Sequence, residues 1–455
     1  MENLDRIIES LKQPMIDTLA QWIKVPSVKG EKEDGAPFGK EVRTMLDTAI
    51  ATCEGLGFRT KNVDGYAMHA DLGEGNDEDA LAILAHVDVV PVGDGWHYPP
   101  FGAVIEDGKM YGRGTGDDKG PAVAALYAMK AVQMAGIPLK RKVRLILGCD
   151  EESGWEDMAY YTAHETMPRM GFSPDADYPV INIEKGMVAL ELRAPLAKTG
   201  LQILRWSTGE RTNVIPGHAE ALIKGGKEMI EKVNAISRQY GWPVEAHMTE
   251  GGVCIKAEGI PGHAAYPEAG RNAIGQMLIT LKELGAEGPI RLLADAVGTT
   301  YYGEHLGAQI QDGLSGKLTC NMGILRIEND SLFATLDIRC PILTDRDYLV
   351  EMIKQHLPGI AVTVTASKAP HYVPEQSELV TELLNAYHEV TGLPKKALAI
   401  GGGTYAKVLK EGVAFGASFP GDPELAHQAN EYISLDSLAR SMAIFARAIV
   451  RLAGK

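Results

Sequence analysis

A histidine and an aspartate directly follow a short apolar run. The run 81–85 (Leu-Ala-Ile-Leu-Ala) has the composition of a buried parallel strand, and His86 and Asp88 come after it. Because alternate residues of an extended chain point to the same side, both side chains lie on one face. An imidazole oriented by a carboxylate is the usual form of a metal-bound histidine. The pair alone is equally compatible with a structural histidine held by a neighbouring aspartate.

A glycine-rich turn with two aspartates follows at 112–121 (Gly-Arg-Gly-Thr-Gly-Asp-Asp-Lys-Gly-Pro). Pro121 suits the first turn of a helix, and 122–134 is rich in helix-forming residues. A carboxylate at this turn, from Asp117 or Asp118, can reach the strand end that carries His86.

Two further predicted strands are flanked by acids. The segment 142–149 predicts a buried strand and is followed by Glu151 and Glu152, whereas Asp175 and Asp177 precede a predicted strand at 179–183. Adjacent buried glutamates repel unless cations or protons compensate, although a solvated acidic loop is the alternative for this motif alone. Histidines and carboxylates from distant stretches suit a two-metal hydrolytic centre, and the absence of thiolate favours Zn²⁺, Mn²⁺ or Co²⁺.

These strings resemble a family of metallopeptidases with two catalytic metals, which includes carnosinases, aminoacylases, succinyl-diaminopimelate desuccinylases and PepV-type dipeptidases. The resemblance rests on His86-x-Asp88 and on Gly-Arg-Gly-x-x-Asp-x-Lys-Gly at 112–120, and it runs over nearly the full length. Within the family, 211–220 (Arg-Thr-Asn-Val-Ile-Pro-Gly-His-Ala-Glu) and 401–405 (Gly-Gly-Gly-Thr-Tyr) are most similar to the PepV-type bacterial dipeptidases.

The resemblance implies two divalent ions, with zinc favoured and manganese or cobalt as alternatives. It assigns five ligands, with Asp117 as the bridge between the ions: His86, Asp117, Glu152, Asp175 and His427. The spacing Asp-x-Lys-Gly selects Asp117 over Asp118, and the Pro-Asp-Ala string selects Asp175, with Asp177 as the alternative.

Catalytic and substrate-binding roles are also implied by the resemblance. Asp88 orients His86, and Glu151 is the general base that deprotonates the bridging water and then protonates the leaving amine. His263 polarises the scissile carbonyl oxygen. The C-terminal carboxylate of the substrate is held by a further set: Asn213, Arg339, Gly403 and Thr404. Taken alone, His263 is compatible with a solvated loop residue and Arg339 with a surface salt bridge.

The expected fold is α/β, in two domains. A catalytic metal-binding domain, 1–186 and 370–455, has a mixed, mainly parallel sheet with helices on both faces. An inserted α+β lid domain, 187–369, alternates strand-like and helical stretches. Its length exceeds the roughly 100 residues of a single compact module. In relatives with a short dimerisation domain, the partner subunit lends the oxyanion-binding histidine. A second module of this insert could stand where that partner would sit, so we expect a monomer whose His263 serves its own metals.

Composition excludes several classes of partner. The net charge of −15 argues against a nucleic-acid partner, and no run approaches the roughly 18 apolar residues of a membrane span. Five scattered cysteines and a charged N-terminus predict a cytoplasmic protein with free thiols.

The predicted function is therefore a metal-dependent dipeptidase that cleaves unblocked dipeptides, with Xaa-His and β-Ala-Xaa among the candidates. The alternative enzyme is an N-acyl amino-acid deacylase or desuccinylase with the same two-metal site. A substrate amine calls for a carboxylate, for which Asp177 is a candidate, whereas a succinyl group calls for a cation. A catalytically inactive regulator on the same scaffold would lack a ligand or the base, and none is missing.

Overall fold

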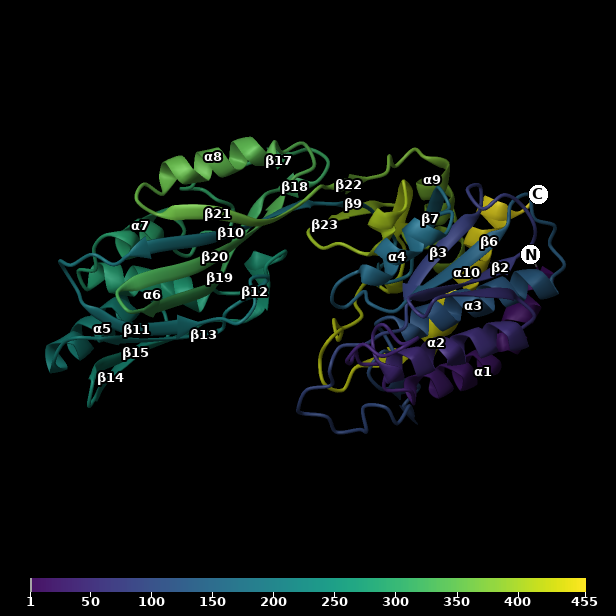
Figure 1. Cartoon of the computed structure of the whole chain (residues 1–455), viewed down its shortest axis with the longest axis horizontal. Coiled ribbons are helices and arrows are strands. Elements are labelled where there is room, and N and C mark those ends of the chain that lie inside the picture. The colour runs from purple at the N-terminus through teal and green to yellow at the C-terminus, as the bar shows by residue number, and fades with distance from the viewer. Residues whose placement is uncertain (1) are drawn as a thin grey trace. The chain divides into compact units, whose positions relative to one another are not determined.

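The computed structural model describes residues 2–455, which divide into two compact units (Figure 1). The first unit comprises the chain up to Asn182 together with Val373–Leu398 and Gly403–Lys455. The second comprises Ile183–Tyr372 and Ala399–Gly402. Among the described residues, no helix is both long and apolar enough to cross a membrane.

A nine-stranded mixed sheet organises the first unit. Its four central strands, β6 to β24, are parallel, and the outer strands are antiparallel to their neighbours. The order across the sheet is β1 (Arg59–Val63), β2 (Ala67–Leu72), β6 (Val143–Gly148), β3 (Leu81–His86), β7 (Met170–Ser173), β24 (Glu411–Ala414), β9 (Val180–Glu184) and β22 (His371–Tyr372), with β23 (Ala397–Ile400) also paired to β9. The predicted α/β class is confirmed.

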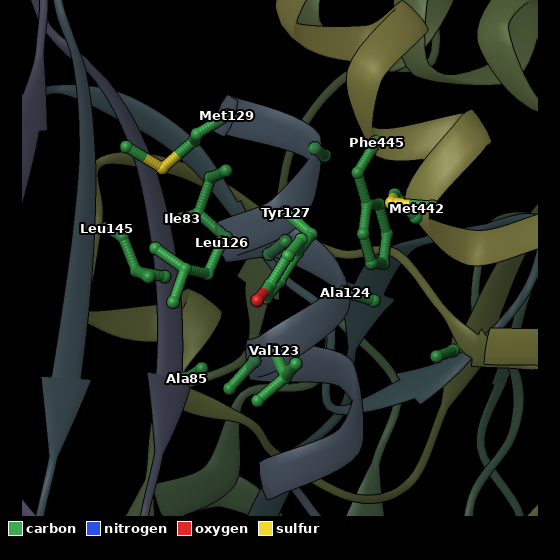
Figure 2. Packing of buried hydrophobic residues seen from close by; sticks show 14 of the residues in the cluster. Ile83, Ala85, Val123, Ala124, Leu126, Tyr127, Met129, Leu145, Met442 and Phe445 are labelled. Atoms are coloured by element: carbon green, nitrogen blue, oxygen red, sulfur yellow. The ribbon is translucent and has the colours of Figure 1, made fainter. Parts of the chain in front are cut away.

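Strand β3 is buried on both faces, which explains its unbroken apolar run. Ile83 and Ala85 pack with helices α3 (Lys119–Met134) and α10 (Leu435–Ala453), as Figure 2 shows. Ala82 and Leu84 belong to a second cluster under α4 (Glu156–His164) and the 3₁₀ turn η2 (Tyr405–Val408). Helices α1 (Glu2–Ile23), α2 (Lys40–Gly55) and α9 (Glu378–Thr391) complete the layers on this sheet.

Short strands hold the loops that follow the sheet. β26 (Tyr432–Ser434) pairs with β5 (Lys109–Tyr111), which pairs with β4 (Val104–Glu106). β8 (Ala176–Asp177) pairs with β25 (Ala417–Ser418). Segments far apart in the sequence are thereby joined just beyond the carboxyl ends of β3, β6 and β7.

The second unit is built on an eight-stranded antiparallel sheet. The strands in order are β14 (Val244–Thr249), β15 (Gly252–Glu258), β13 (His218–Ile223), β11 (Ile203–Thr208), β19 (Thr319–Glu328), β20 (Ser331–Cys340), β10 (Gly186–Pro195) and β21 (Ala361–Lys368). Its helices are α5 (Lys227–Tyr240), α6 (Ala273–Glu283), α7 (Pro289–Ala296) and α8 (Arg346–His356). Two short pairs complete it: β12 (Val214–Ile215) with β16 (Gly262–His263), and β17 (Gln311–Asp312) with β18 (Gly316–Lys317).

Candidate metal centre

His86 is the last residue of β3, and its ring is fully buried. Its Nδ1 lies 3.0 Å from the backbone oxygen of Asp88. Because a carbonyl oxygen only accepts hydrogen bonds, Nδ1 carries the proton and Nε2 is the nitrogen available to a metal. Nε2 lies 3.0 Å from Asp117 Oδ1 and 3.7 Å from Asp175 Oδ2.

The carboxylate of Asp88 has a second role that its spacing from His86 does not reveal. Its Oδ1 lies 3.4 Å from His86 Nδ1 and accepts the N–H of Glu151 at 3.3 Å. Its Oδ2 accepts the N–H of Glu152 at 3.2 Å. One buried carboxylate thus lies beside the histidine at the end of β3 and also accepts two N–H groups of the acidic loop after β6.

Asp117 lies between the two histidines. Its Oδ1 faces His86, and its Oδ2 lies 3.2 Å from His427 Nε2. Burial opposes ionisation, yet hydrogen bonds from His427 and His86 hold the pKa of Asp117 well below its usual range. His427 Nε2 also lies 2.9 Å from Glu152 Oε2. The Asp117–Asp118 peptide bond is cis.

The five predicted ligand residues therefore converge, and Asp118 joins them. Asp118 is fully buried, and its Oδ2 accepts the N–H of His86 at 3.2 Å. Its Oδ1 has no hydrogen-bond partner within the described part of the chain. Two overlapping groups, which share His86, have ligand atoms within 4.8 Å of one another and are candidates to hold an ion: His86 with Asp117 and Glu152, and His86 with Asp118 and Asp175.

The donor set fits divalent cations of the zinc type, because it offers imidazole nitrogen and carboxylate oxygen without thiolate. Burial and mutual repulsion raise the pKa of Asp175 and of Asp118 above their usual range. Such crowding of buried acids is costly in the absence of positive charge. Asp177 lies outside this cluster, with Glu424 and Asp422 as its charged neighbours.

Glu151 lies beside the ligands and belongs to neither group of three. Burial, followed by repulsion from Glu152, Asp117 and Asp88, raises its pKa to about 8, although His86 opposes the shift. Bound cations would favour the ionised form and lower that pKa. A carboxylate with a pKa near the working pH is suited to exchange a proton with water and substrate.

The other predicted substrate-binding residues belong largely to the second unit. The backbone oxygen of Asn213 accepts the N–H of Ala264 at 2.9 Å, next to His263. His263 Nδ1 accepts the N–H of Ala265 at 3.2 Å, so the neutral ring carries its proton on Nε2. That tautomer presents a donor, as polarisation of a carbonyl oxygen requires.

Arg339 is more constrained than the sequence suggests. Its Nε and Nη2 donate to the two oxygens of Asp337 at 2.6 and 2.9 Å, and Nη1 donates to the Gly401 oxygen at 2.8 Å. In the first unit, Thr404 Oγ1 accepts the N–H of Ala406 and begins η2, directly after Gly403. The alternation of residues along β20, with Asp337 and Arg339 at positions i and i+2, could have signalled this ion pair.

Comparison with known proteins identifies the class of this centre. Residues 82–451 match the family model of peptidase family M20/M25/M40. The chain belongs to this family. It is therefore a peptidase, a hydrolase of peptide bonds, and metal dependence is typical of its class.

Full-length relatives and a solved structure agree with this membership. The M20 peptidase is 38% identical to the putative dipeptidase YtjP of Bacillus subtilis, over 97% of this chain and 98% of the relative. It is 33% identical to the β-Ala-Xaa dipeptidase of Lactobacillus delbrueckii subsp. lactis, over 99% and 98%. The fold resembles human carnosine dipeptidase 1 with a TM-score of 0.60 and 16% identity, over 99% and 98% of the two chains. The predicted family is confirmed.

Proposed function

We propose that this M20 peptidase hydrolyses unblocked dipeptides at a two-metal site. The observation that carries the proposal is the position of Asp117, with one carboxylate oxygen facing His86 and the other facing His427. A carboxylate between two imidazoles is the arrangement that a bridging ligand requires. The β-Ala-Xaa dipeptidase, one third identical over nearly the whole chain, supports a dipeptide as substrate.

The proposed ligands are those predicted from the sequence, and zinc is the proposed ion, with manganese or cobalt as alternatives. Two divalent ions at this site would polarise the scissile carbonyl and lower the pKa of a water molecule between them. Glu151 takes the proton of that water and gives it to the leaving amine. Asp88 keeps His86 and the backbone of Glu151 in place during both transfers.

We further propose that the second unit acts as a lid over the substrate. His263 donates from Nε2 to the carbonyl oxygen as it gains negative charge. The side chains of Asn213 and Arg339 and the N–H groups of the Gly403–Thr404 turn hold the C-terminal carboxylate. Asp337 fixes the plane of the Arg339 guanidinium, so an incoming carboxylate meets a donor that is already oriented.

The proposal also covers the free amino group of the dipeptide, the cellular compartment and the oligomeric state. Asp177, with Asp422 and Glu424 near it, makes an environment that favours an ammonium group over a succinyl carboxylate. All five cysteines are unpaired and buried, which supports a reducing, cytoplasmic setting. We propose that the active species is a monomer, because the long second unit could take the place of a partner subunit.

A substrate panel tests this function. Stripped protein is given Zn²⁺, Mn²⁺ or Co²⁺ in turn, and the release of amino acids is measured from unblocked dipeptides, β-Ala-Xaa included. N-acetyl and N-succinyl amino acids serve as the competing substrates. We expect turnover of the dipeptides only. Faster hydrolysis of the N-acyl compounds would replace the dipeptidase with a deacylase, and no hydrolysis of either would refute both.

A further inference from the structure

The buried carboxylate of Glu431 accepts several backbone hydrogen bonds from the loop that carries Asp117. Its Oε1 accepts the N–H groups of Gly114 at 3.0 Å, Gly116 at 2.9 Å and Asp117 itself at 3.3 Å. Its Oε2 accepts from Arg113 Nη1 at 2.7 Å. The side chain is about 1% exposed. The carboxylate therefore holds the backbone of the loop at and before Asp117.

The same contacts join the two segments that supply Asp117 and His427. Glu431 lies four residues after His427. Its backbone oxygen accepts the N–H of Gly112 at 2.9 Å, next to the pairing of β26 with β5. In return, Arg113 Nη1 donates to the backbone oxygen of Gln428 at 3.1 Å, beside His427. Each segment thus holds the backbone next to the other segment's candidate ligand.

His427 requires such support. Its φ is +65°, in the left-handed region that a residue with a side chain adopts at a cost. Its Nε2 nevertheless reaches both Asp117 and Glu152. The Arg113 guanidinium is itself held by packing, 5.3 Å from the centre of the Trp96 ring.

We infer that Glu431, supported by Arg113, is a positioning residue of the two-metal centre, which sets the separation of Asp117 and His427 and thereby the affinity for the ions. The inference rests on the proposed function and extends it to a residue outside both groups of candidate ligands. Partners outside the ligand shell commonly change metal affinity by 10–100-fold when they are replaced. A Glu431→Gln change keeps the shape but places an NH₂ group opposite the N–H donors of either Arg113 or the loop.

The test measures Zn²⁺ affinity of the metal-stripped full chain by competition with a chromophoric chelator, together with the Tm of the same samples. We expect Glu431→Gln to weaken Zn²⁺ binding at least about 10-fold. Asp71→Asn is the matched control, because Asp71 is a partly buried carboxylate on β2 paired with Arg144 Nε and Nη2, both at 2.8 Å. It should lower the Tm and leave Zn²⁺ affinity at the wild-type value.

Wild-type affinity in Glu431→Gln would overturn the inference, and so would an equal loss in Asp71→Asn. If Glu431→Gln does not fold, Arg113→Lys decides in its place, since it keeps the charge but not the fixed donor geometry. Reduced affinity supports the inference, and wild-type affinity overturns it. A wild-type chain that binds none of Zn²⁺, Mn²⁺ and Co²⁺ would overturn both this inference and the proposed function. Tight Zn²⁺ binding that depends on Glu431, without dipeptide hydrolysis, would overturn the proposed function alone.

Discussion

Replacing Glu151 with glutamine should stop turnover while both ions stay bound. The side chain belongs to neither group of three ligand atoms, so its amide removes a proton acceptor and no ligand. The loop should keep its conformation, because two backbone contacts of residue 151 do not involve its side chain. The N–H of Glu151 donates to Asp88, and the backbone oxygen of Glu151 accepts from Trp155 Nε1 at 2.9 Å. The substitution therefore separates proton transfer from metal binding.

The size of the effect follows from the role. General acid–base catalysis contributes about 10²–10⁴-fold, which corresponds to roughly 3–5 kcal/mol of barrier. Glu151 transfers the proton twice, so kcat should fall by at least that factor. In the metal-free chain the raised pKa of Glu151 means that folding at neutral pH requires this carboxyl to take up a proton, which a neutral amide does not need. The metal-free variant should therefore unfold at a Tm no lower than that of the wild type.

The assay combines amino-acid release at saturating dipeptide with metal analysis of the desalted protein. Glu152→Gln, the same chemical change one residue along, is the control. It should lose metal, because Glu152 is a proposed ligand whose carboxylate lies next to His427. A near-normal kcat in Glu151→Gln would refute the role of general base. Loss of both ions from Glu151→Gln would show that Glu151 is a ligand.

Four further outcomes are expected. Asp117→Ala should remove metal and activity together, whereas Asp118→Ala should be milder; the reverse result would move the bridge to Asp118. Amidation of the dipeptide C-terminus should cut kcat/KM sharply, and equal hydrolysis of acid and amide would exclude carboxylate recognition. His263→Ala should lower kcat with metal content intact, and mixing it with Glu151→Gln should restore nothing; recovered activity would mean that His263 acts across a dimer. Burial lowers the pKa of His69 from 6.5 to about 4, so the unfolded chain binds a proton that the folded chain excludes. Stability should fall by roughly 3 kcal/mol as the pH drops through that window, and an identical pH profile of unfolding in His69→Gln would contradict this cause.

The strands of the sheet were predictable where burial on both faces requires an unbroken run of apolar residues. Strand β3 is covered on both faces, so every residue of 81–85 is apolar, and the chemistry begins at the next position. Ser377 Oγ accepts the N–H of Val380 and caps α9, which begins at Glu378, and a serine at this position is a local helix-start signal. Such signals are local, and they also placed the predicted ligands at the ends of their segments.

The remaining features depend on contacts between distant segments, which leave no local pattern. Nothing beside Asp88 in the sequence indicates that its carboxylate also holds the loop after β6. Asp118 looks like a spare acid next to Asp117, but the chain buries it against the backbone of His86. Glu431 lies more than 300 residues away in sequence from the loop whose N–H groups it accepts. In each case a buried carboxylate accepts hydrogen bonds from the backbone N–H groups of a distant segment, and such contacts have no sequence signature.

The central claim is that hydrolysis requires two ions at the site around Asp117. The most direct test removes all metal with a chelator, then adds back Zn²⁺ in known ratios while dipeptide hydrolysis and bound zinc are followed together. We expect an inactive stripped chain, and activity that saturates at two ions per chain. Full dipeptidase activity in the stripped chain, or saturation with no bound metal, would contradict it.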